Sequence, residues 1–141
     1  MSKERFTTSR RRARTTTLQV LYEVDSGVGH EWKDVIERVL NTSNHGINSN
    51  SFVRNLVKGV MDNTAEIDIL ISRFAQSWPI DQMAAVDRSL LRMAIYELLF
   101  EAASPQKVVI NEAVEIAKGF GGENSSKFMN GILGALVGKP K

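Results

Sequence analysis

The chain has 141 residues, of which 43% are hydrophobic and 24% charged, and its formal net charge is +2. These values are typical of one globular domain, or of two small helical halves that share an interface. The absence of cysteine excludes disulfides, thiolate zinc ligands and cysteine nucleophiles. No apolar run has the length of a membrane span or the form of a signal peptide, and we therefore expect a cytoplasmic protein without membrane contact.

The positive charge is concentrated at the amino terminus. Residues 1–14 hold six cationic side chains against the single acid Glu4, a formal charge of +5, which leaves −3 for residues 15–141. Arginine forms planar bidentate contacts with phosphate and stacks on bases, so the cluster indicates a phosphate-rich partner. The simpler alternative is a solvated tail. The six cations are Lys3, Arg5, Arg10, Arg11, Arg12 and Arg14.

The arginines lead directly into the first predicted helix. Apolar residues recur every three or four positions up to Val24, and Ser9 is suited to cap the helix start. Residues 1–8 would then form a flexible basic arm. Four arginines would occupy the first two turns, where the helix dipole disfavours each cation by about 0.3–1 kcal/mol. This placement suggests that binding, rather than stability, determined these residues.

Six further helices follow from the same spacing, and no stretch alternates with the period of a strand. Residues 41–51 are polar, uncharged and turn-prone, and they predict a flexible loop. Trp78-Pro79, Ser104-Pro105 and the glycines of 119–122 separate later helices. The helix over 86–99 is expected to be the longest and the central one. The predicted helices cover about 10–24, 32–40, 52–61, 64–74, 86–99, 105–117 and 125–137.

The fold class is therefore all-α, with about seven helices in two packed helical bundles. We expect one helical domain over residues 9–138 and a short carboxy-terminal tail at 139–141.

The sequence offers no catalytic or metal-binding set. His30 and His45 lack carboxylates at ligand spacing, and no serine lies in a nucleophile-elbow motif. The glycines of 119–122 follow a helix rather than a strand and lack the Gly-Lys-Ser/Thr ending of a phosphate-binding loop. They fit better as the end of one helix and the turn into the next.

The segment that follows these glycines is a second candidate for anion binding. Asn124, Ser125 and Ser126 stand at a predicted helix start, where backbone N–H groups can meet an anion, and Lys127 follows. Phe128 has the spacing of a core residue, but an aromatic ring here could also stack on an unpaired base. From spacing alone the core interpretation is favoured.

Four sequence blocks resemble the NusB transcription antitermination family, in the same order and over about residues 9–138. The central block is VDRSLLRMAIYEL at 86–98, which is similar to the family's central helix. The others are RRRAR at 10–14 with QVLY at 19–22, VVINEAVEIAK at 108–118 with the following Phe120-Gly121, and SSKFMNGILG at 125–134.

This resemblance implies a bacterial, non-enzymatic protein without a cofactor. It would bind the boxA element of nascent RNA jointly with NusE, a ribosomal small-subunit protein, and so alter elongation by RNA polymerase in ribosomal RNA operons. A homodimer is left open. The rival interpretation is a protein-interaction module whose basic arm binds an acidic protein.

The expected contact residues fall into two sets. The resemblance places NusE near the first and fifth predicted helices and carries over Tyr22 and Asp87, although Asp87 also has a sufficient structural explanation as an acid at a helix start. Asn124 stands where some relatives have an acid, and a neutral amide should repel phosphate less. The expected RNA-binding residues are Arg10, Arg11, Arg12, Arg14, Asn124, Lys127 and Phe128.

Overall fold

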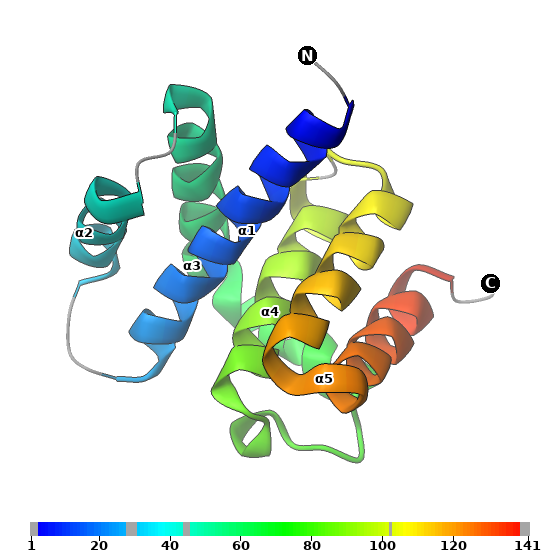
Figure 1. Cartoon of the computed structure of the whole chain (residues 1–141). Helices are drawn as coiled ribbons and strands as arrows, with labels where there is room; N and C mark the ends of the chain where they lie inside the picture. Colours follow the sequence, from blue (N-terminus) through cyan, green and yellow to red (C-terminus); the bar gives the residue numbers. More distant parts are fainter. Residues whose placement is uncertain (1–2, 28–30, 44–45, 102, 139–141) are drawn as a thin grey trace. The chain divides into compact units, whose positions relative to one another are not determined.

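The computed structural model of the chain describes residues 3–27, 31–43, 46–101 and 103–138, with the backbone alone for 3–8 (Figure 1). Every regular element in these ranges is helical, so the predicted all-α class is confirmed. None of the helices in this part of the chain has the length and apolar character needed to cross a membrane. The elements are α1 (Lys3–Asp25), α2 (Trp32–Ser43), α3 (Ile47–Phe74), a 3₁₀ turn η1 (Ile80–Gln82), α4 (Ala85–Ile95), a π-helical turn η2 (Tyr96–Glu101) and α5 (Gln106–Gly138).

Two of the helices are interrupted by a single residue with non-helical backbone angles. Asn63 breaks α3 at φ −123° and ψ 16°, and its side-chain amide donates a hydrogen bond of 2.7 Å to the carbonyl of Gly59. Gly122 breaks α5 at φ 71° and ψ −152°, a region that only glycine enters easily. With these two breaks, α1–α5 comprise the seven helical segments that the sequence predicts.

The predicted loop over 41–51 and the predicted helix over 86–99 both differ from the structure. The loop predicted over 41–51 is largely helical, because α2 continues to Ser43 and α3 begins at Ile47; residues 44–45 lie outside the described part. Asparagine and serine cost at most about 0.7 kcal/mol each in a helix, which neighbouring turns can offset. The helix predicted over 86–99 is not the longest, and it changes from α to π geometry at Tyr96.

The chain divides into two compact units, and the first is Met1–Lys58. In it α1 packs on α2, and the apolar faces of both helices are buried. Arg38 of α2 forms an ion pair with Glu23 of α1, and Arg54 of α3 makes two hydrogen bonds to Glu37 of α2 at 2.9 and 3.0 Å. The hydrogen bond from Arg54 lowers the pKa of the Glu37 carboxyl below its ordinary value.

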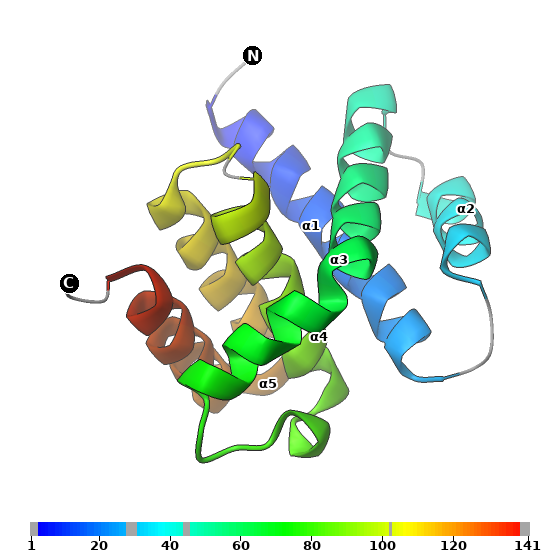
Figure 2. The same ribbon diagram turned by 180° about the vertical axis from the view of Figure 1, so that it is seen from behind.

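The second unit is Gly59–Lys141, and α4 is its central helix. It packs along α5, and the two run side by side in Figures 1 and 2. Six of its eleven residues are buried, which agrees with the prediction of a helix contacted on several sides. Each large apolar side chain buried in this way contributes about 1.5–3 kcal/mol. The six buried residues of α4 are Ser89, Leu90, Leu91, Met93, Ala94 and Ile95.

Gly59 and Tyr96 form a close contact between α3 and the π turn. A β-carbon placed on Gly59 would lie 2.0 Å from Cζ of the Tyr96 ring, so only glycine leaves room for the ring at this position. The Tyr96 ring also stacks on Phe100, with centroids 5.9 Å apart and 11° between the planes. This glycine thus anchors the start of η2 against α3.

The Gly59 contact predicts a clear stability loss. Gly59→Ala should destabilise the protein by about 1–3 kcal/mol, because the Tyr96 ring must move out of a packed position. Gly131→Ala is the control, since it lies in helical backbone and has no atom within 4 Å of the added carbon. It should stabilise by up to about 1 kcal/mol. Chemical denaturation of both variants measures the difference, and equal stabilities would contradict the packing role of Gly59.

Candidate nucleic-acid interface

The arginine cluster lies well inside α1 rather than at its start. The helix begins at Lys3, so Ser9 is not its cap, and most of the expected flexible arm at 1–8 has helical backbone. No glycine or proline interrupts residues 3–25, and nothing in this sequence stops the helix from extending toward the amino terminus. The dipole acts mainly on the first turn, so the expected penalty on the arginines does not apply.

Phe52 divides the cluster into two sets. Its ring, near the start of α3, has the guanidinium carbon of Arg10 4.2 Å from its centroid and that of Arg14 at 5.4 Å. Arg14 is only 3% exposed and Arg10 is half-buried, whereas Arg11 and Arg12 are exposed. Of the four arginines at 10–14, two are therefore held against an aromatic ring and two are exposed.

The burial of Arg14 changes how this residue is understood. A buried cation is costly unless neighbouring groups compensate for its lost hydration. The negative face of the Phe52 ring supplies part of that compensation, worth about 0.5–2 kcal/mol for one cation–π contact. The sequence predicts that Arg14 binds RNA, whereas its observed surroundings are those of a side chain packed inside the protein.

The second candidate segment follows the break at Gly122. Asn124 and Lys127 are exposed and Phe128 is half-buried. Ser126 is buried, and its hydroxyl donates a 3.0 Å hydrogen bond to the carbonyl of Glu123. The positive φ of Gly122 ends the first half of α5, as the sequence predicts, and the helix restarts with this segment at its first turns.

Phe128 packs against an aromatic residue that the sequence did not single out. The rings of Phe128 and Trp78 have centroids 4.8 Å apart and are tilted by 60°. Trp78 is 44% exposed, in the segment between α3 and η1. At Trp78-Pro79 the sequence predicts only the end of a helix, and no local pattern connects Trp78 with a phenylalanine so far along the chain.

The two expected partner-binding residues belong to different units. Tyr22, in the last part of α1, is 45% exposed although it follows the buried Leu21. Asp87 lies in the first turn of α4 and is half-buried. The residue before this helix, Ala84, makes no side-chain capping bond, so Asp87 provides an acidic group for the positive end of the helix.

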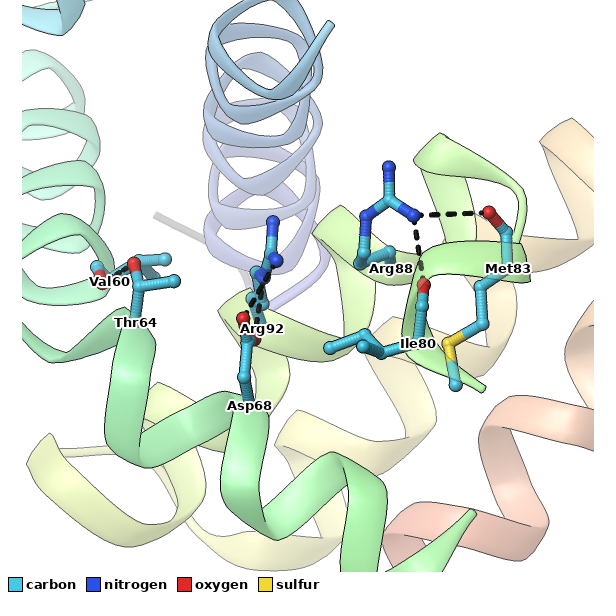
Figure 3. Close-up of polar contacts among 7 residues, drawn as sticks. All are labelled: Val60, Thr64, Asp68, Ile80, Met83, Arg88 and Arg92. Atoms are coloured by element: carbon cyan, nitrogen blue, oxygen red, sulfur yellow. Dashed lines mark hydrogen bonds and ion pairs between the residues drawn. The ribbon is translucent and has the colours of Figure 1, made fainter. Parts of the chain in front are cut away.

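The arginines that follow Asp87 are engaged within the protein (Figure 3). Arg92 makes a two-point ion pair with Asp68 of α3, with N–O distances of 2.8 and 2.9 Å. Arg88 donates through Nη1 to the carbonyls of Ile80 and Met83, at 2.9 and 3.3 Å. These contacts tie α4 to α3 and to η1. They also use guanidinium donors of Arg88 and Arg92 that a phosphate contact would need.

The described ranges contain no group of three or more His, Asp or Glu side chains that could hold a metal ion. His30 and His45, which the sequence analysis considered for such roles, lie outside the described residues.

Fold and charge together define an all-helical protein with an exposed cationic surface on its first helix. Residues 11–137 match the NusB family. The "Transcription antitermination protein NusB" of Dehalococcoides mccartyi strain CBDB1 is 43% identical over 130 residues, which cover 92% of this chain and 90% of the relative. The chain belongs to the NusB family.

Solved structures agree with this assignment. NusB from T. maritima superposes with a TM-score of 0.85 at 37% identity, and the match covers 92% of this chain and 91% of that one. A structure of antitermination factors NusB and NusE in complex with dsRNA gives a TM-score of 0.86 at 27% identity, covering 94% and 98%. The predicted family resemblance is therefore confirmed.

The division of the arginine cluster predicts different effects on stability. Arg14→Ala should lower the free energy of unfolding by about 1–3 kcal/mol, because it removes a buried side chain and its ring contact. Arg12→Ala should change that energy by no more than about 0.5 kcal/mol, because Arg12 is exposed. Urea titrations of the two variants measure both values. Equal stabilities would show that Arg14 has no structural role.

Proposed function

We propose that the protein is a transcription antitermination factor that binds boxA RNA together with NusE and acts on elongating RNA polymerase in the bacterial cytoplasm. Membership of the NusB family carries this proposal, because the relatives at about 42% identity are transcription antitermination proteins. A structural neighbour in complex with NusE and dsRNA supports NusE and RNA as partners, and binding of boxA through unpaired nucleotides is part of the proposal. The protein performs no reaction in this role and needs no cofactor.

Phosphate binding is assigned first to the exposed cations of α1. Arg11 and Arg12 are exposed and suited to bidentate contacts with phosphate oxygens. Arg10 is half-buried over Phe52, which limits the number of orientations its guanidinium can take. Arg14 supports the interface from inside by fixing the helix face. The contribution of these charges to RNA affinity should fall as salt concentration rises.

Sequence preference requires contacts with bases rather than with phosphates. In an A-form duplex the base edges lie in a deep, narrow groove, so reading a sequence such as boxA requires unpaired nucleotides. The segment of Asn124, Lys127 and Phe128 offers an amide for hydrogen bonds, a cation and an aromatic ring. We assign base contacts to this segment and phosphate steering to α1.

The RNA assignment is tested by a charge-matched pair of double variants. Arg11→Ala with Arg12→Ala should weaken binding to a boxA-like single strand and reduce the slope of log affinity against log salt by about 0.7 per lost contact. Arg73→Ala with Lys107→Ala removes the same charge from two exposed positions elsewhere and should change both quantities much less. Fluorescence anisotropy with labelled RNA at several salt concentrations measures them.

A scrambled strand separates specific from general binding in the same assay. The natural protein should prefer the boxA-like strand, and the preference should increase when NusE is present. Equal losses of affinity in the two double variants would reject the α1 assignment. Absence of RNA binding, together with salt-sensitive binding to an acidic protein, would favour the rival interaction module.

NusE binding is assigned to Tyr22 and Asp87. Asp87→Asn should weaken the NusE complex while leaving RNA binding by the isolated protein intact, because a basic ribosomal protein would lose a charge partner. The same change should cost about 0.3–1 kcal/mol of stability through the helix dipole. Asp34→Asn removes the first-turn acid of α2 and is the matched control. Calorimetric titration of both variants with NusE measures the affinity of each complex. An unchanged affinity of the Asp87→Asn variant would remove Asp87 from the interface.

A further inference from the structure

Trp78 is a large aromatic side chain held at the surface by several local contacts. Its backbone N–H donates to the carbonyl of Ala75 at 3.1 Å, and its indole N–H lies 3.4 Å from the carbonyl of Gln82. Proline follows it directly, and the 3₁₀ turn η1 begins at Ile80. These contacts fix the backbone at Trp78 and give the indole N–H a partner, while 44% of the residue's surface is exposed.

Phe128 leaves part of the indole available. The two rings are tilted by 60° at a centroid separation of 4.8 Å, and a single neighbouring ring can cover only one of the two faces of an indole. An exposed tryptophan that meets one neighbouring ring at a tilt and keeps 44% of its surface exposed has the form of an aromatic binding platform. Packing against Phe128 explains the buried part of Trp78 but not the exposed part.

The charges beside the pair favour a nucleotide over an apolar peptide. Lys127 is exposed and directly precedes Phe128, and the exposed amide of Asn124 lies one helical turn before it. A base that stacks on the rings would bring its phosphate near a cation and its polar edge near an amide. The exposed Asp81 in η1 limits the net positive charge here, so stacking rather than charge must provide most of the affinity.

We infer that Trp78 and Phe128 together form a stacking site for one unpaired base of bound RNA, with Lys127 contacting the adjoining phosphate. This inference rests on the proposed RNA-binding function. It adds Trp78 to the interface and gives Phe128 a second role, which is to support the indole. Stacking of this kind tolerates different bases, because every base presents a π face.

The intrinsic fluorescence of Trp78 provides a direct test. The chain has two tryptophans, so Trp32→Phe leaves Trp78 as the sole emitter. Saturation of this variant with a boxA-like single strand should quench its emission and shift the wavelength of maximum emission. Inorganic polyphosphate, which has charge but no bases, should produce neither change. Trp78→Phe leaves only Trp32, which is not part of the stacking site, and its emission should change much less than that of Trp78 on saturation with the same RNA.

Affinity measured by anisotropy of labelled RNA is the second readout. Trp78→Leu should weaken RNA binding about 5- to 150-fold, which corresponds to the loss of one stacked base at about 1–3 kcal/mol. Trp78→Phe retains an aromatic face and should restore most of the binding. If Trp78→Leu does not fold, the emission of the Trp32→Phe variant decides alone.

The possible results separate this inference from the proposed function. RNA binding without a change in Trp78 emission would overturn the stacking site and leave the proposed function intact. A change that NusE produces in the absence of RNA, with no further change when RNA is added, would assign Trp78 to a protein contact and also overturn the inference. Failure of the natural protein to bind RNA, alone or with NusE, would reject both.

Discussion

The burial of Arg14 against Phe52 determines which side chains α1 presents to a partner. An ion moved out of water loses several kcal/mol of hydration, so its position must be well compensated and is not easily exchanged. Arg10, one turn earlier, lies on the same side of the helix and shares the ring. Arg12 falls on nearly the opposite side, and Arg11 lies between them. Rotation of the helix by one residue would turn Arg11 and Thr15, or Ser9 and Ala13, toward the ring in place of Arg10 and Arg14, so this contact decides which cations can reach phosphate.

Glycines set comparable constraints in the second unit. Gly59 admits the Tyr96 ring where α4 turns into a π helix, and Gly122 allows the break after which α5 restarts. The restart places Asn124 and Lys127 at the surface and turns Phe128 toward Trp78. The interface we propose therefore depends on backbone positions that make no contact with RNA themselves. Ion pairs such as that between Asp68 and Arg92 hold the supporting helices together.

The parts of the structure that local sequence encodes were predicted well. Three- and four-residue spacing identified the helical segments, and glycine identified the break in α5. Predictions that required knowledge of distant packing were wrong or missing. Ser9 was expected to cap a helix that begins at Lys3, and nothing in the sequence indicated that Arg14 would be buried. Phe52 and Trp78 meet their partners across long stretches of chain, and periodicity reports which face of a helix is apolar but not what that face touches.

Arginine-selective labelling tests the central claim, which is that one helix carries both a buried structural arginine and exposed RNA-binding arginines. The folded protein is treated briefly with phenylglyoxal, with and without a boxA-like strand, and modification is measured residue by residue by mass spectrometry. The account predicts that Arg11 and Arg12 are modified in the free protein and protected by RNA, while Arg14 is unreactive in both. Modification of Arg14 at the rate of Arg12, or no protection of Arg11 and Arg12 by bound RNA, would contradict it.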